Sequence, residues 1–114
     1  MPDQNQYLKL LITSLDEAQA TDVVVIPVSK QTTITDYMII ASGRSSRHVK
    51  AIANQVMELM SNSGMTALRC NGLDTSEWVL IDFADFIVHI MQPECREFYN
   101  LEGLWQDRPS NLTQ

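Results

Sequence analysis

Residues 78–91 read WVLIDFADFIVHIM and contain two runs of strand-forming residues on either side of a two-residue connection. So short a connection predicts an antiparallel β-hairpin. Because side chains alternate along a strand, Trp78, Leu80 and Asp82 share one face of the first strand, and the residues between them form an apolar second face. The apolar face of the hairpin therefore packs on a core, while the other face carries both apolar and acidic side chains. On this mixed face Trp78 is equally compatible with a core position and with an interface anchor.

Upstream of the hairpin lies the pattern of an amphipathic helix, which Ser45 or Ser46 is placed to cap. Its apolar stripe consists of Val49, Ile52, Ala53, Val56, Met57 and Met60. Gly64 follows the last apolar position, as expected at a helix C-terminus. Strand patterns at residues 37–41 and 65–70 flank the helix, and a strand–helix–strand unit of this length favours a parallel, right-handed crossover.

The remaining elements complete an α/β domain. The first is a helix that ends near Ala18, with Leu8, Leu11, Ile12 and Leu15 at helical spacing. A buried strand follows at residues 23–26, and Pro93 suits the first turn of a last helix. We predict a mixed five-stranded sheet flanked by helices, with residues 1–105 as a single domain and residues 106–114 as a flexible tail.

Composition is that of one small globular domain. The chain has 114 residues, 45% of them hydrophobic, which is enough for a single core. It has no run approaching the roughly 20 apolar residues of a membrane span, and its first residues lack the basic and apolar regions of a secretory signal. Cys70 and Cys95 lack the spacing of paired ligands, so we expect free thiols in a reducing compartment and a cytoplasmic protein.

Charge is distributed unevenly along the chain, whose formal net charge is -6. Acids dominate from Asp74 to Asp107, where Arg96 is the one base. Such a segment repels phosphate, so it disfavours nucleic acid as the main partner and favours a basic protein. A thin basic cluster lies upstream, made of Arg44, Arg47, His48 and Lys50. It leaves direct RNA binding as a weaker hypothesis.

Three polar residues of the hairpin invite a catalytic interpretation. Asp82 and Asp85 could bind a metal or exchange protons, but one lies on a strand and the other in the turn, where Asp is common. His89 lies among apolar neighbours and shares a face with Ile87 and Met91, a setting more typical of a structural or interface histidine. No partner stands at the offset of a known catalytic triad. We therefore predict no catalytic residue, no metal and no cofactor.

The segment from Ser42 to Ser46 lies at a strand-to-helix junction, where backbone N–H groups often bind anions. The residues of this candidate anion site are Gly43, Arg44, Ser45 and Arg47. The segment lacks the Lys-Ser/Thr ending of a P-loop and the three glycines of a dinucleotide-binding loop. A turn glycine followed by serine caps is the simpler interpretation, and we favour it.

Three segments together resemble the Iojap family of ribosomal silencing factors. They are residues 34–49 (ITDYMIIASGRSSRHV), the hairpin at residues 78–91, and residues 96–105 (REFYNLEGLW). The similarity extends from about Leu8 to Trp105. It implies a fold akin to the nucleotidyltransferase superfold without its catalytic residues, which leaves a nucleotide-binding or nucleotidyltransferase-like enzyme as the alternative function.

The resemblance further implies a partner and a docking site. The partner is ribosomal protein L14 (uL14) of the large subunit. Binding to this protein would block association with the small subunit, repress translation and contribute to large-subunit assembly. The docking residues transferred from the family are Trp78, Leu80, Asp82, Asp85, His89, Met91 and Tyr99. A homodimer of the free protein is compatible with the family. One departure is Ala84, where the family usually has glycine; if this turn needs positive φ, alanine costs about 1 kcal/mol.

Overall fold

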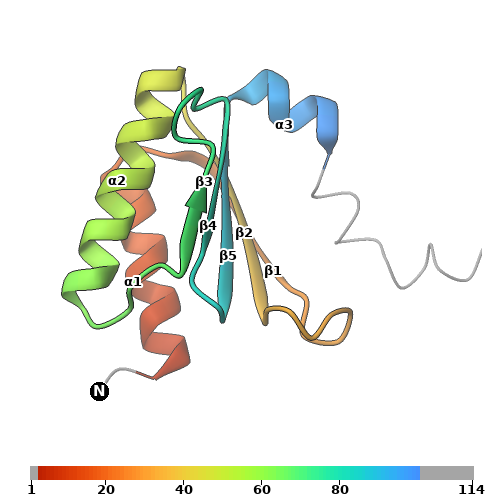
Figure 1. Ribbon diagram of the computed structural model, residues 1–114. Helices are drawn as coiled ribbons and strands as arrows, with labels where there is room; N and C mark the ends of the chain where they lie inside the picture. Colours follow the sequence, from red (N-terminus) through yellow and green to blue (C-terminus); the bar gives the residue numbers. More distant parts are fainter. Residues whose placement is uncertain (1–2, 101–114) are drawn as a thin grey trace, which may run out of the picture.

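The computed structural model describes residues 3–100, apart from the side chains of residues 98 and 99, and shows a five-stranded sheet with helices on both sides (Figure 1). The strands are β1 (Thr21–Pro27), β2 (Tyr37–Ser42), β3 (Arg69–Asn71), β4 (Trp78–Asp82) and β5 (Phe86–Met91). Their order in the sheet is β1-β2-β5-β4-β3. The predicted tail, residues 106–114, and the predicted domain end at Trp105 lie outside the described residues.

Strand β5 lies at the centre of the sheet, antiparallel to β4 and parallel to β2. The predicted hairpin is therefore confirmed, with β4 ending at Asp82. The predicted crossover is only half right. Strands β2 and β3 run in the same direction, as expected, but the β4–β5 hairpin lies between them. The nearly continuous apolar sequence of β5 suits a strand covered on both faces, whereas the short, polar β3 suits an edge.

Helices α1 (Gln4–Glu17) and α2 (Ser46–Asn62) cover one face of the sheet (Figure 1). The predicted stripe of α2 is buried except for Met57, which packs on the core from a half-buried position. In α1 the prediction for Ile12 was wrong, because this side chain is 36% exposed. The helix is rotated so that Tyr7, Leu11, Ser14 and Leu15 face the core instead.

The two edge strands differ most from the sequence-based expectation. Strand β1 was predicted to be buried, but only Ile26 is, and Val23 to Val25 are half-buried. Strand β3 was predicted over residues 65–70 and spans only Arg69–Asn71. An edge strand has a neighbour on one side alone, so its apolar residues lose less surface and its pairing ends sooner.

The opposite face of the sheet carries the short helix α3 (Pro93–Tyr99) and the loop of residues 28–36 that joins β1 to β2 (Figure 1). We call this surface the α3 face. A second, smaller apolar cluster lies on it, made of Ile26, Val28, Met38, Ile40 and Met91. Arg96 of α3 is buried there, and its Nη1 donates a hydrogen bond of 2.9 Å to Ser42 Oγ. Helix α3 is thereby fastened at one end of the face.

None of the helices within residues 3–100 is both long and apolar enough to cross a lipid bilayer.

Candidate docking site on the sheet

The hairpin places most of the predicted docking residues together on the α3 face. In the β4–β5 register Trp78 stands opposite Met91, Leu80 opposite His89, and Asp82 opposite Ile87. Trp78, Leu80 and Asp82 are half-buried, whereas His89 is 5% exposed and Met91 is fully buried. The predicted docking residues of β4 are therefore partly exposed, as is Ile87 of β5, whereas His89 and Met91 lie beneath them.

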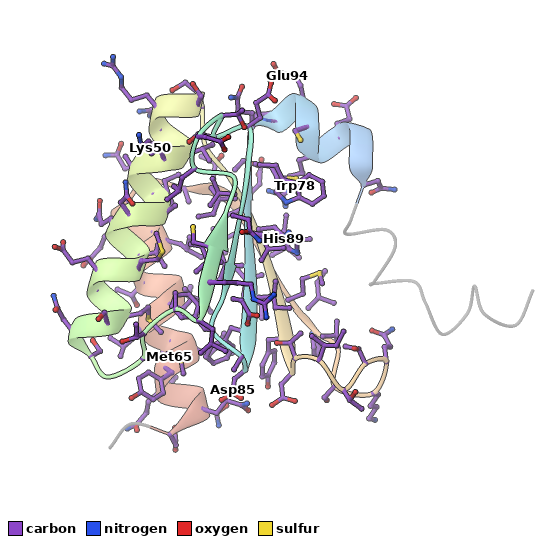
Figure 2. The ribbon with its side chains drawn as sticks, in the orientation of Figure 1. Lys50, Met65, Trp78, Asp85, His89 and Glu94 are labelled. Carbon is purple, nitrogen blue, oxygen red and sulfur yellow. The ribbon has the colours of Figure 1, made fainter. Side chains whose placement is uncertain are left out.

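Trp78 and His89 form a hydrogen-bonded pair toward the α3 end of this surface (Figure 2). The indole Nε1–H donates to His89 Nδ1 at 3.0 Å, and the ring centroids are 5.8 Å apart at 49°. A histidine that accepts at Nδ1 carries its proton on Nε2 and is neutral. Burial lowers the pKa of His89 from 6.5 to about 4, because the charged form loses its hydration. The histidine therefore orients Trp78 as a neutral acceptor at physiological pH.

Both carboxylate oxygens of Asp82 interact with neighbouring groups of the protein. Its Oδ1 accepts a hydrogen bond of 2.8 Å from the Ala84 N–H, and its Oδ2 lies 3.4 Å from Arg69 Nε of β3. The aspartate thus stabilises the turn, and Arg69 partly neutralises its charge. Sequence reasoning missed Arg69, because only the β3–β4 register brings it opposite Asp82. The local negative charge is smaller than the sequence suggested.

Asp85 is the acid that remains available in the turn (Figure 2). Its backbone oxygen accepts N–H bonds from Asp36 and Tyr37, which joins the hairpin to the start of β2. Among residues 3–100, no hydrogen bond or ion pair holds its half-buried carboxylate. Asp85 therefore contributes an unneutralised negative charge at this end of the α3 face.

Ala84 has a positive φ, a conformation that glycine adopts more readily than alanine. Its φ is 74°, and the Asp85 N–H donates to the Phe83 oxygen at 3.0 Å across it. A bond between residues i and i+2 with positive φ at the centre is the rarer, strained kind of γ-turn. A Cβ in this conformation costs about 1 kcal/mol.

Replacing Ala84 with glycine is expected to raise the free energy of unfolding by about 1 kcal/mol, because glycine adopts positive φ without that strain. Urea denaturation followed by circular dichroism measures the change. Ala51 is exposed on α2, so Ala51→Gly is the matched control and should lower stability by about the same amount. An Ala84→Gly protein that is no more stable than the parent would contradict the strain argument.

The candidate anion site already uses several of its donors within the protein. The Gly43 N–H donates to Met91 O at 3.0 Å, and the Arg44 N–H donates to His48 Nδ1 at 2.9 Å. Ser45 Oγ caps α2 by accepting from the His48 N–H. A Cβ on Gly43 would lie 2.7 Å from Val49 Cγ2, so the glycine is needed for close packing. Anion binding by the exposed Arg44 and Arg47 stays a prediction.

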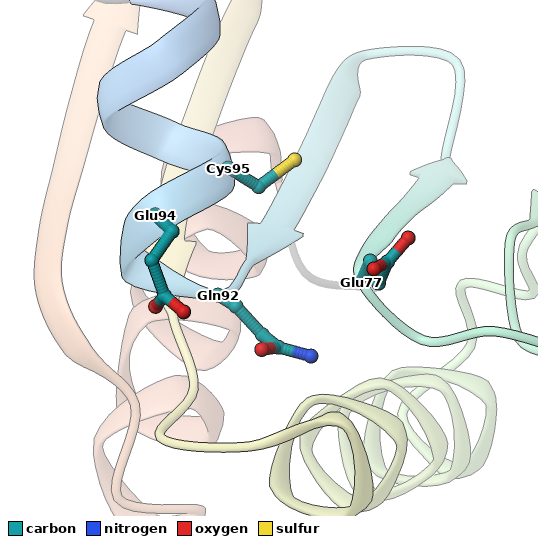
Figure 3. Close-up of a pocket in the computed structure, with 4 residues that line it drawn as sticks. All are labelled: Glu77, Gln92, Glu94 and Cys95. Atoms are coloured by element: carbon teal, nitrogen blue, oxygen red, sulfur yellow. The ribbon is translucent and has the colours of Figure 1, made fainter.

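A shallow hollow of 340 Å³ opens between the start of β4 and α3, lined by Glu77, Gln92, Glu94 and Cys95 (Figure 3). Sequence reasoning did not single it out, since Glu77 is remote in the chain from the other three residues. Burial, and then the charge of Glu77, raise the pKa of the Cys95 thiol, so the thiol is protonated and a poor nucleophile. Both cysteines are free, as predicted.

Tyr99 is the last residue of α3, and its side chain lies outside the described part of the structure. Over residues 3–100, no three His, Cys, Asp or Glu side chains are grouped closely enough to hold a metal ion.

The chain is similar to characterised proteins over most of its length. The family model described as "Ribosomal silencing factor during starvation" (RsfS) matches residues 2–114. A ribosomal silencing factor of Zymomonas mobilis is 43% identical over 103 residues, which cover 90% of this chain and 77% of that protein. One from Bacillus subtilis is 32% identical over 107 residues, covering 94% and 91%. A crystal structure of a Chromobacterium violaceum protein superimposes with a TM-score of 0.89 at 35% identity, covering 92% of this chain and 88% of that one.

Proposed function

Because the chain belongs to the family of ribosomal silencing factors, we propose that it binds the large ribosomal subunit through ribosomal protein L14 and sterically blocks the small subunit. It acts in the cytoplasm by occupying space, and it forms or breaks no covalent bond. The observation that carries this proposal is the α3 face, where Trp78 is oriented by His89 and half-exposed beside Leu80. Aromatic side chains held in place in this way are the usual anchors of protein interfaces.

The docking surface that we propose has a contact layer and a supporting layer. Trp78, Leu80 and Asp85 contact the partner, because their side chains are partly exposed. His89 and Met91 support them from below, and Asp82 fixes the turn through Ala84. The acids of the turn complement a basic ribosomal protein, which favours the encounter and its orientation. Tyr99 keeps a supporting role in the proposal.

Purified ribosomal subunits test this function directly. The protein should sediment with large subunits alone, and increasing amounts of it should reduce the fraction of subunits that join when magnesium is raised. Sedimentation with small subunits, or joining that is unaffected at saturating protein, would overturn the proposal. Calorimetry with nucleoside triphosphates tests the enzymatic alternative, for which saturable binding would be needed.

Replacing Asp85 with lysine is expected to weaken binding to the large subunit about tenfold at low salt, because it removes an attractive charge and adds a repulsive one. The difference from the parent protein should shrink as salt is raised. Glu58→Lys, on the exposed side of α2, is the matched charge reversal and should leave affinity nearly unchanged. Equal losses for both variants would show a general charge effect instead of contact at Asp85.

A further inference from the structure

Ile34 is the most exposed of the large hydrophobic side chains described, at 76%. A single exposed isoleucine is commonplace on protein surfaces and needs no explanation by itself. Ile34 differs because hydrogen bonds fix the conformation of its loop and because this loop lies on the α3 face.

The loop around Ile34 is held in one conformation by its own hydrogen bonds. The Ile34 N–H donates to Thr32 Oγ1 at 3.1 Å, while the next residue, Thr35, is buried and donates from its hydroxyl to Tyr37 O at 3.3 Å. The Asp36 N–H then donates to Asp85 O at 3.2 Å, which joins the loop to the hairpin turn. Ile34 is therefore presented by an ordered loop, and little conformational entropy would be lost when a partner covers it.

The loop lies on the α3 face. Residues 28–36 stand on the same side of the sheet as α3, at the opposite end of the strands (Figure 1). Val28 at the start of the loop is packed in the cluster that contains Met38, Ile40 and Met91. The start of the loop thus belongs to the same apolar cluster against which Trp78 packs. A partner lying along the strands from Trp78 would reach the loop next.

The charge around Ile34 matches the same kind of partner. The unneutralised Asp85 adjoins the loop through its backbone bond to the Asp36 N–H, whereas the Asp36 carboxylate accepts from Gln4 Nε2 of α1 at 2.7 Å. Lys30 is the base that the loop itself carries. An exposed apolar side chain in a loop that adjoins the unneutralised Asp85 fits a basic protein that offers both an apolar contact and a positive charge. It fits an RNA backbone poorly, because the acids would repel the phosphates.

We infer that Ile34 is a second apolar anchor, through which the β1–β2 loop contacts the same basic ribosomal protein that covers Trp78. The inference rests on the proposed function and extends the docking surface from the hairpin to the loop. Two anchors at opposite ends of the strands fix the orientation of the protein on the subunit, which a contact at one end alone would leave free to rotate.

The test compares Ile34→Ser with Leu68→Ser in titrations against purified large subunits. Leu68 is almost as exposed, at 68%, and precedes β3, where alternation places it with Cys70 on the helix side of the sheet. Burial of an isoleucine side chain predicts that Ile34→Ser binds roughly tenfold more weakly, while Leu68→Ser keeps the parent affinity. Both residues are solvent-exposed, so both variants should fold, and circular dichroism verifies this.

The other outcomes separate this inference from the function on which it rests. If the parent protein binds and Ile34→Ser binds equally well, the loop is not a contact, and only the inference fails. If Ile34→Ser changes the sedimentation of the free protein but not its affinity for subunits, the loop joins two copies of this chain, and the inference also fails. If the parent protein does not bind large subunits, the proposed function fails as well.

Discussion

Replacing Trp78 with alanine is expected to weaken binding to the large ribosomal subunit by about a hundredfold or more. The indole is the largest partly exposed side chain on the β4 surface, and its hydrogen bond to His89 fixes its orientation before any partner arrives. Loss of such a preorganised aromatic anchor removes buried area and the fit of the neighbouring residues together. Fluorescently labelled protein titrated with purified large subunits measures the loss.

A second variant separates the ring from its hydrogen bond. Trp78→Phe keeps an aromatic surface but has no N–H to donate to His89, so it should lose a smaller part of the affinity. Urea denaturation of both variants shows how much of each loss is due to folding. A Trp78→Ala protein that stays folded and inhibits subunit joining at the same concentration as the parent would remove the α3 face from the docking surface.

Acidification is expected to lower the free energy of unfolding by about 3 kcal/mol between pH 7 and pH 4 through His89 alone. Burial lowers the pKa of this histidine from 6.5 to about 4, so between those values the unfolded chain binds a proton that the folded protein does not. The stabilisation is therefore fully present above pH 6.5 and is lost as the pH falls toward 4. Protonation of Nδ1 also removes the acceptor for the Trp78 N–H.

His89→Asn isolates this effect from the carboxylates that also titrate in acid. The asparagine side-chain oxygen is placed to accept from Trp78 Nε1, yet it does not titrate. The variant should therefore lose less stability than the parent over the same pH range, by about 3 kcal/mol. Urea denaturation at pH 4, 5, 6 and 7 gives the two curves. Parallel curves for the two proteins would show that His89 is not the source of the acid sensitivity.

The sequence predicted the elements whose patterns are local. The alternation in β4, the short turn before β5 and the apolar stripe of α2 each depend on neighbouring residues alone, and the structure confirms all three. It also predicted that Trp78, Leu80 and Asp82 share a face, because the period of a strand is two. The resemblance to ribosomal silencing factors, carried by residues 34–49 and 78–91, agrees with the family match.

What the sequence could not show depends on contacts between distant segments. The insertion of the hairpin between β2 and β3 is set by which strands gain most from a central position, and no local pattern records that competition. The partial neutralisation of Asp82 by Arg69 follows from the β3–β4 register. The burial of Met91 depends on the second cluster of the α3 face, and the low exposure of His89 accompanies its pairing with Trp78 of the neighbouring strand.

The central position of β5 in the sheet also determines when the chain can fold during its synthesis. Both β2 and β4 pair with β5, which is the last strand to be synthesised among residues 3–100. A nascent chain that ends before Phe86 has no partner for the inner edge of either strand, and its apolar residues stay uncovered. The native sheet therefore closes late, through pairing between segments remote in sequence, which is a slow kind of folding step. Deletions from the C-terminus that reach β5 should abolish folding altogether instead of shortening the domain by one strand.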